Sequence, residues 1–403
     1  MKAIMYGGGN IGRGFIGPLF RNAGYEVVFI DVQTELIEAL NNRRTYPLRI
    51  ISDAGHEDII IDGISAIDGK DSEAVSDAIA SADICATAVG AGILGKIAPN
   101  VALGIKKRLA NSDKPLNIII CENLMDADKI FAEMVGKDLS GEERQRCREQ
   151  IGFVEASIGR MVPVQTDEMK DGDPLRVCVE RYGSLPVDKD AFKGTIPEIT
   201  NMYPFSPFGF YIERKLYVHN LGHAVCAYLG MLSGYEYIFE AVSDIEIRFV
   251  AQNAMLESVA ALSMEYGVEL AGLMPHVNDL ILRFKNRALK DTCARVGGDP
   301  VRKLARKDRL IGPAFLCEGQ GVSSDYISIG IAAGLFQFLK ENGREQNQAN
   351  AVSALKELAE VEQGDSFTEV VLENYRCILN GGKAHELALL VDERRAKRTE
   401  GIV

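Results

Sequence analysis

Short apolar runs alternate with helical periodicity at the start of the chain. An apolar run at residues 3–6 precedes a helical pattern that begins near Ile11, and a second run at residues 26–30 precedes a helical pattern over residues 34–42. Extended runs and helical periodicity that alternate in this way are typical of consecutive strands and helices. The first residues therefore predict a βαβ unit.

Two later runs, at residues 84–89 and 117–121, are apolar at almost every position. Strands with this pattern are buried on both faces, as they are in parallel sheets that helices cover on each side. We therefore expect the first half of the chain to be a doubly wound sheet.

The second half has a different pattern, with long helical periodicity at residues 244–266 and 350–361. The stretch at residues 186–207 between the two halves holds four prolines and little periodicity, which is typical of turns. The expected fold class is α/β, with an N-terminal Rossmann-type doubly wound sheet domain at residues 1–195 and a mainly α-helical C-terminal domain at residues 196–403.

Length and charge agree with a globular protein of two domains. A chain of 403 residues is longer than one hydrophobic core usually holds. The net charge of -12 repels nucleic acid, and no basic stripe interleaved with aromatic residues opposes that repulsion. No apolar run approaches the ~18 residues of a membrane helix, and the first residues lack a basic signal-peptide start. We expect a cytoplasmic protein that binds neither nucleic acid nor membrane; the sequence leaves the oligomeric state open.

Eight cysteines lie far apart in the sequence, and none of them forms a C-x-x-C pair. Scattered cysteines inside apolar or helical stretches are typical of buried, reduced thiols. The same spacing lacks the cysteine clusters that a structural zinc ion needs.

A glycine-rich turn follows the first expected strand. Residues 7–12 read G-G-G-N-I-G, which matches G-x-G-x-x-G at the start of a helix. In this fingerprint Gly7 permits the tight turn, Gly9 lets the backbone approach a pyrophosphate, and Gly12 lets the helix pack closely. We expect the whole turn to bind a dinucleotide, with Asn10 and Ile11 included.

An acidic residue, Asp31, ends the second expected strand, 19 positions after Gly12. A carboxylate at this place accepts hydrogen bonds from the adenosine ribose, which favours NAD over NADP. The alternative is that Asp31 only starts a turn. Val89 and Gly90 follow a later expected strand and are expected to form another wall of the NAD site.

The densest polar cluster of the chain lies at residues 213–223 and leads into an apolar helix. If the cluster is helical, at 100° per residue Lys215, Asn220 and His223 fall within an arc of about 140°. Oxidation of an alcohol needs a base for the hydroxyl proton and donors that stabilise the oxygen as it gains charge. We expect Lys215 to be the base in its neutral form, Asn220 to donate to the oxygen and His223 to orient the hydroxyl.

Two other interpretations of this cluster stay open. An amphipathic helix with a solvated Lys215 and a core histidine would show the same residue types. His219 and His223 also have the i, i+4 spacing of zinc-binding helices, although no glutamate follows His219 and no third ligand is evident. We expect no metal.

The residues described so far resemble the polyol-specific long-chain dehydrogenases over nearly the whole chain. The resemblance is carried by residues 7–17, G-G-G-N-I-G-R-G-F-I-G, and by Lys215, Asn220 and His223, which match the family's K-x4-N-x2-H motif. It implies reversible, zinc-independent oxidation of a polyol phosphate to a ketose phosphate by NAD, such as D-mannitol 1-phosphate to D-fructose 6-phosphate.

Three further segments extend the resemblance: residues 117–123 (N-I-I-I-C-E-N), 283–286 (R-F-K-N) and 299–304 (D-P-V-R-K-L). The resemblance implies that Asn123 shares the oxyanion role. Candidates for binding the substrate are Arg283, Asn286, Arg302 and Lys303. Guanidinium and ammonium groups suit an anionic substrate, although charged side chains are often only solvated.

One segment departs from the family. Residues 159–163 read G-R-M-V-P where the family commonly shows D-R-I-x-P. Arg160 is retained as a candidate for the anionic end of the substrate, but the preceding carboxylate is lost, which changes the charge offered to a sugar. A reductase of a keto sugar acid such as fructuronate or tagaturonate, or of an unphosphorylated ketose, is therefore an alternative. A nucleotide-sensing protein without catalysis is a third.

Overall fold

The computed structural model describes residues 1–361, 365 and 367–400 of the chain. It contains two compact units, Met1–Tyr211 and Ile212–Val403. The domain limits expected from the sequence, residues 1–195 and 196–403, stay a prediction.

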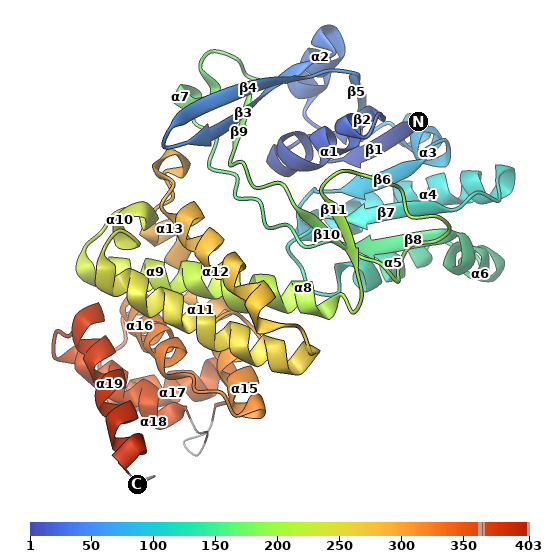
Figure 1. Cartoon of the computed structure of the whole chain (residues 1–403). Helices are drawn as coiled ribbons and strands as arrows, with labels where there is room; N and C mark the ends of the chain where they lie inside the picture. Colours follow the sequence, from blue (N-terminus) through green and yellow to red (C-terminus); the bar gives the residue numbers. More distant parts are fainter. Residues whose placement is uncertain (362–364, 366, 401–403) are drawn as a thin grey trace. The chain divides into compact units, whose positions relative to one another are not determined.

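A parallel sheet forms the centre of the first unit (Figure 1). Among the described residues it has six strands in the order β5-β2-β1-β6-β7-β8, and every neighbouring pair is parallel. The strands are β1 (Lys2–Tyr6), β2 (Glu26–Asp31), β5 (Ile64–Asp68), β6 (Ile84–Thr87), β7 (Leu116–Ile120) and β8 (Ile151–Glu155). The strand order reverses between β1 and β6, and ligands of doubly wound sheets bind at the carboxyl ends of the strands at such a point.

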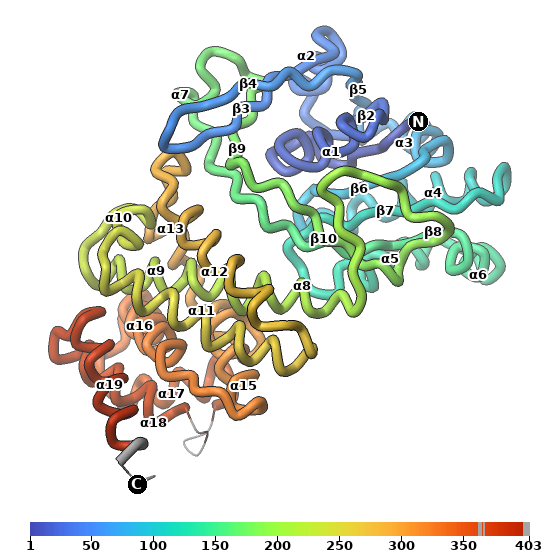
Figure 2. The backbone as a smooth tube through the Cα atoms, in the orientation of Figure 1, coloured from blue at the N-terminus to red at the C-terminus, as the bar shows by residue number. Residues whose placement is uncertain are grey.

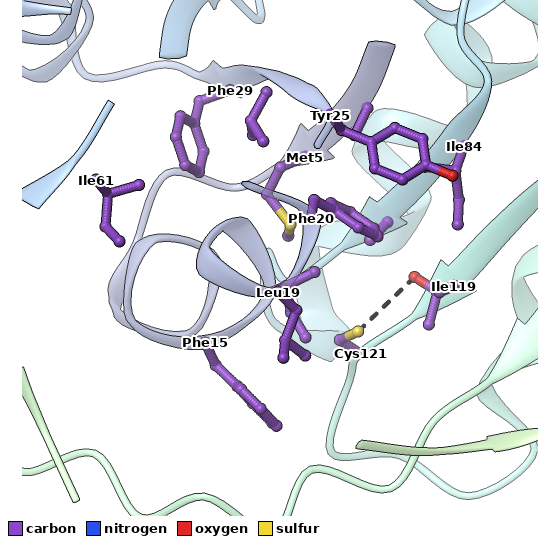
Figure 3. Packing of buried hydrophobic residues seen from close by; sticks show 14 of the residues in the cluster. Met5, Phe15, Leu19, Phe20, Tyr25, Phe29, Ile61, Ile84, Ile119 and Cys121 are labelled. Atoms are coloured by element: carbon purple, nitrogen blue, oxygen red, sulfur yellow. Dashed lines mark hydrogen bonds between the residues drawn. The ribbon is translucent and has the colours of Figure 1, made fainter. Parts of the chain in front are cut away.

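Both faces of this sheet are buried, which explains why its strands are apolar at almost every position. Ala3 and Met5 of β1 belong to one hydrophobic cluster, whereas Ile4 and Tyr6 belong to the cluster on the opposite face. Figure 3 shows part of the first cluster, in which side chains of the first helix pack beside strand residues: Phe15, Leu19, Phe20, Met5, Phe29, Ile84 and Ile119. The helices of the first unit are η1 (Gly12–Ile16), α1 (Gly17–Asn22), α2 (Thr34–Arg43), α3 (Ser72–Ala80), η2 (Ala91–Ile93), α4 (Leu94–Asn111), α5 (Ala127–Gly136), α6 (Gly141–Gln150) and α7 (Asp167–Lys170).

Two small sheets accompany the main one, and the sequence did not predict them. The first has the order β4-β3-β9 and contains the hairpin of β3 and β4 seen in Figure 2. The second pairs β10 with β11 in parallel. Their strands are β3 (Tyr46–Ser52), β4 (Gly55–Ile61), β9 (Val177–Val179), β10 (Leu185–Asp188) and β11 (Met202–Phe205).

The described part of the second unit is helical. Its central helix α11 (Ile245–Tyr266) packs against α9 (Asn220–Ser233), α12 (Leu270–Phe284), α15 (Ile311–Gln320) and α16 (Asp325–Glu341). This helix begins where the Asp244 carboxylate accepts hydrogen bonds from two backbone N–H groups, and it ends at Gly267, whose φ of 63° is left-handed. The expected α/β class, with a Rossmann-type sheet followed by a helical part, is confirmed.

The other helices after α7 are α8 (Gly209–Arg214), η3 (Lys215–His219), α9 (Asn220–Ser233), α10 (Ile238–Ala241), α12 (Leu270–Phe284), η4 (Arg287–Leu289), α13 (Cys293–Gly297), α14 (Pro300–Lys303), α15 (Ile311–Gln320), α16 (Asp325–Glu341), α17 (Gln348–Ala359), α18 (Thr368–Leu379) and α19 (Ala384–Glu400). Within the described chain, none of the helices combines the length and the apolar character needed to cross a bilayer.

Candidate active site

The glycine-rich turn leaves no room for side chains at two of its positions. Gly7 has a φ of 104°, and a Cβ atom there would lie 2.4 Å from the carbonyl oxygen of Ala88. A Cβ atom on Gly12 would lie 1.9 Å from the carbonyl oxygen of Gly7. Gly9, in contrast, is exposed and faces open space, and Asn10 beside it is exposed as well. The turn is therefore closely packed at Gly7 and Gly12 and accessible at Gly9. A backbone that a pyrophosphate approaches needs this arrangement.

The Asp31 carboxylate is tied to the glycine turn. Its Oδ2 atom accepts a hydrogen bond from the Gly8 N–H at 2.8 Å, and its Oδ1 atom accepts from the N–H groups of Val32 at 2.8 Å and Gln33 at 3.1 Å. An ionised carboxylate has about four acceptor sites, so capacity for a ribose hydroxyl remains. Asp31 thus organises both the glycine turn and the turn that follows β2, and its contact with ribose stays a prediction.

The loop after β6 is held by a buried carboxylate. Glu122, which is 6% exposed, accepts hydrogen bonds from the N–H groups of Val89 at 2.9 Å and Gly90 at 2.8 Å. Gly90 has a φ of 93°, a conformation that favours glycine. Asn123 follows Glu122 beyond the carboxyl end of β7 and is exposed. The expected NAD wall therefore has a rigid support that the sequence reasoning did not assign.

Two arginines support the π-helical turn η1 that follows the glycines. Arg160 donates to the carbonyl oxygens of Gly14 at 2.9 Å and Glu180 at 3.0 Å, and its guanidinium lies over the Phe15 ring. Arg13 is buried and donates to the carbonyl oxygen of Gly8 at 2.6 Å. These bonds give Arg160 a role in holding the turn, and its contact with substrate stays a prediction.

In the second unit, the expected catalytic cluster begins in a π-helical turn. Residues 215–219 form η3, and the backbone N–H of Asn220 donates to the carbonyl oxygen of Lys215. This i→i+5 bond places one more residue in the turn than an α-helix has, so the arc calculated from 3.6 residues per turn does not describe these side chains. Such π-turns are rare and are frequent at functional sites.

Lys215 is half-buried at the start of this turn. Burial, followed by the charge of Arg309, lowers its pKa to about 8. A lysine with this pKa has an appreciable fraction of neutral amine near neutral pH, which a proton acceptor requires. The interpretation of Lys215 as an ordinary solvated surface lysine is therefore disfavoured.

His223 lies in an apolar and acidic setting. Its ring stacks on Phe284, and its Nε2 atom is 3.5 Å from Oδ2 of Asp291. Burial lowers the pKa of His223 to about 4 against the opposing charge of Asp291, so the imidazole is neutral at pH 7. A neutral ring oriented by a carboxylate can both donate and accept a hydrogen bond.

The second histidine of the pair is deeper. His219 is 7% exposed, and its ring centroid is 6.2 Å from that of His223. Burial lowers the pKa of His219 well below its ordinary value. In the described part of the chain, no group of three or more His, Cys, Asp or Glu side chains is arranged to bind a metal ion. Zinc independence stays a prediction.

The candidate anion-binding residues of the second unit differ in their surroundings. Arg283 is 8% exposed, with Nη1 3.6 Å from Asp279, and its charge helps to lower the pKa values of His219 and His223. Arg302 is half-exposed and donates to Asp299 at 2.8 Å.

Asn286 uses its side chain to cap η4, where it accepts from the Ala288 N–H at 3.1 Å. Lys303 is 3% exposed. The structure thus brings Lys215, His219, His223 and Arg283 together within the second unit, whereas Asn123 and Arg160 belong to the first.

Sequence reasoning missed two residues of this site, Asp291 and Arg309. Asp291 follows a short helix in a polar stretch, and Arg309 stands in the charged run R-K-D-R at residues 306–309. Such runs are usually solvated, yet the Arg309 side chain is only 12% exposed. The sequence signal available was the apolar L-I-G-P that follows, which predicts that this turn is packed.

Comparisons with known proteins show the family of the chain. A model of the mannitol dehydrogenase Rossmann domain matches residues 1–201, and a model of the mannitol dehydrogenase C-terminal domain matches residues 209–377. Mannitol-1-phosphate 5-dehydrogenase of Brevibacillus brevis is 36% identical over 391 residues, which are 96% of this chain and 100% of that protein. The enzyme of the same name from Thermoanaerobacter pseudethanolicus is 39% identical over 342 residues, 85% of this chain and 87% of that protein.

Solved structures share the fold at low sequence identity. D-sorbitol dehydrogenase in substrate-free form has a TM-score of 0.80 at 15% identity and covers 95% of this chain and 94% of its own. Pseudomonas fluorescens mannitol 2-dehydrogenase, in a ternary complex with NAD and D-mannitol, has a TM-score of 0.72 at 16% identity and covers 97% of this chain and 94% of its own. With both domain models and full-length relatives in agreement, the chain belongs to the mannitol dehydrogenase family, and the resemblance noted in its sequence is confirmed.

Proposed function

We propose that this protein is an NAD-dependent oxidoreductase that interconverts a polyol phosphate and a ketose phosphate, D-mannitol 1-phosphate and D-fructose 6-phosphate being the expected pair. The observation that carries the proposal is the amine of Lys215, whose pKa burial lowers to about 8, on the same continuous helical stretch, η3 and α9, as the neutral imidazole of His223. The names of the relatives at 36% and 39% identity support the phosphorylated substrate.

The first unit fits the cofactor. The open backbone at Gly9, the tight turn at Gly7 and the acceptor at Asp31 match the needs of a pyrophosphate and a ribose. NAD, when bound there, supplies the acceptor for the hydride that leaves the alcohol carbon.

The second unit supplies the proton chemistry. In alcohol oxidation, the neutral Lys215 amine takes the hydroxyl proton while the carbon loses hydride, so that the C–O bond becomes a carbonyl. Asn220 and Asn123 donate to the oxygen as it gains negative charge, and His223, which Asp291 orients, positions the hydroxyl. In ketose reduction the Lys215 ammonium returns the proton. None of these steps uses a metal ion.

A substrate panel tests the function. NADH oxidation, followed by absorbance, is expected with D-fructose 6-phosphate at a kcat/KM far above that with D-fructose or D-fructuronate, and EDTA treatment is expected to leave the rate unchanged. Activity confined to the uronate would replace this proposal with a sugar-acid reductase. NADH binding without turnover on any ketose or polyol would favour a nucleotide sensor.

We further propose a cytoplasmic location. All eight cysteines are free, and seven of them are buried. Free thiols of this kind suit a reducing compartment. Fractionation of the host cell tests this point.

A further inference from the structure

A buried lysine in the second unit has no partner of its own. Lys303, the last residue of α14, is 3% exposed, and among the described residues its ammonium group makes no hydrogen bond and no ion pair closer than 4 Å. Burial is the main cause that lowers the pKa of Lys303, to about 8. Keeping an ammonium group out of water is costly unless an anion compensates it.

A second cation lies within electrostatic range of Lys303. The guanidinium of Arg309 is 12% exposed, and its Nε atom donates to Oδ1 of Asp308 at 2.7 Å. Among the described residues its two terminal Nη groups donate no hydrogen bond. Asp308 therefore orients the guanidinium through one edge and leaves the paired N–H groups that bind phosphate or carboxylate in a bidentate manner.

The other charged groups that act on Lys303 are paired with one another or with Arg309. After burial, the charges of Arg309 and Arg302 depress the pKa of Lys303, and those of Asp299 and Asp308 raise it. Asp299 is engaged by Arg302 at 2.8 Å, and Asp308 is engaged by Arg309. The two carboxylates that raise the pKa of Lys303 are therefore paired with Arg302 and Arg309, not with Lys303.

The segment that carries Arg309 contacts η3, the turn that begins at Lys215. The hydroxyl of Tyr217, which lies in η3, donates to the carbonyl oxygen of Lys307 at 3.4 Å. The Tyr217 ring packs so closely on Gly312 that a Cβ atom there would lie 2.6 Å from a ring carbon. The charge of Arg309 also reaches Lys215, where it is the second cause of the lowered pKa.

We propose that Lys303 and Arg309 bind the phosphate group of the substrate and determine the preference for phosphorylated over unphosphorylated polyols. The inference rests on the proposed function. The phosphate oxygens accept hydrogen bonds from the Nη groups of Arg309 and from the Lys303 ammonium. The bound anion then neutralises a cation that acts on Lys215, so that occupancy of this site changes the strength of the base.

The test compares substrates with and without phosphate. In Lys303→Gln and Arg309→Gln, kcat/KM for D-fructose 6-phosphate is expected to fall on the order of 100-fold, because a hydrogen bond to a charged group is lost. The value for D-fructose is expected to change only a few-fold. Lys307→Gln is the matched control, because this neighbouring lysine is exposed and its backbone carbonyl, not its side chain, accepts the hydrogen bond from Tyr217. Arg309→Lys, which keeps the charge but loses the paired donors, is expected to be intermediate.

Inorganic phosphate provides a second measurement. It is expected to inhibit the wild-type enzyme competitively with D-fructose 6-phosphate and to raise its melting temperature. Both effects are expected to be lost in Arg309→Gln and to be weakened in Arg309→Lys. Equal losses of activity on both ketoses, or unchanged inhibition by phosphate, overturn the inference.

If the wild type fails to use D-fructose 6-phosphate yet phosphate still stabilises it through Arg309, the proposed function fails and the anion site stands. Stronger competition by D-gluconate than by phosphate at Arg309 would assign the site to a carboxylate instead.

Discussion

The imidazole of His223 stacks on the phenyl ring of Phe284, with the ring centroids 4.8 Å apart and the planes within 8° of parallel. This contact removes one face of the imidazole from water, and burial is the main cause of its lowered pKa. The neutral state of His223 at pH 7 therefore depends on a helix, α12, that is distant from it in sequence.

Replacing Phe284 tests that dependence. In Phe284→Leu the ring face becomes partly solvated, so the pKa of His223 is expected to rise from about 4 toward its ordinary value of 6.5. Histidine titration by NMR measures the shift. An unchanged His223 titration would show that stacking does not set the protonation state.

Asp291 is expected to orient His223. Asp291→Asn keeps the shape and removes the charge 3.5 Å from Nε2, and kcat is expected to fall about 10-fold with little change in KM, because the ring loses its orienting partner. Asp291 also pairs with Arg295, so Arg295→Gln is the control for loss of that ion pair. If both variants lose the same activity, Asp291 acts only through Arg295.

The pH dependence of the reaction follows from Lys215. The amine must be neutral to accept a proton, so kcat/KM for polyol phosphate oxidation is expected to rise about tenfold per pH unit and to level off above a pKa of about 8. Ketose reduction needs the ammonium and is expected to decline above the same pKa. In Arg309→Gln a neighbouring positive charge is lost, so the pKa of Lys215 rises and both curves move to higher pH. A profile without a group near pH 8, or a shift to lower pH in this variant, contradicts the assignment.

The buried carboxylate of Glu122 is expected to control cofactor affinity. In Glu122→Gln one of the two acceptors for Val89 and Gly90 becomes an N–H donor, so the loop after β6 loses one of its two anchors. The Kd for NADH is expected to rise about 10-fold, with a smaller effect on kcat. Quenching of NADH fluorescence measures the Kd. A Kd equal to that of the wild type would show that the loop needs no such support.

The sequence predicted the main sheet and the long helices because their periodicity is imposed by burial. β1 and β2 are apolar throughout since both faces of the sheet are covered, and α11 begins at a capping aspartate and ends at a glycine. β4 was missed because all of its residues except Ile61 are exposed, so its sequence lacks the alternation of apolar and polar residues that marks a half-buried strand. Hydrophobic periodicity also gives no sign of the π-turn at Lys215, because one extra residue per turn leaves the local composition unchanged.

The candidate site also contains residues that the sequence predicted and residues that it did not. Lys215 and His223 were found from their spacing in one helix, whereas Asp291 and Arg309 come from separate turns that only tertiary packing brings to them. Arg160 was expected at the substrate because arginine suits an anion; its guanidinium also donates to the carbonyl oxygens of Gly14 and Glu180, and its contact with substrate stays a prediction. A single sequence does not distinguish an arginine that binds backbone carbonyls from one that binds a ligand.

The role of Lys215 as proton acceptor is tested most directly by chemical rescue of Lys215→Ala. With D-mannitol 1-phosphate and saturating NAD, kcat is expected to fall about 1000-fold while the Kd for NADH is unchanged, and added methylamine is expected to restore part of the rate with a pH dependence set by its own pKa. A variant that keeps turnover near the wild-type rate, or one that no primary amine rescues although NADH and phosphate still bind, would contradict the assignment of Lys215 as the base.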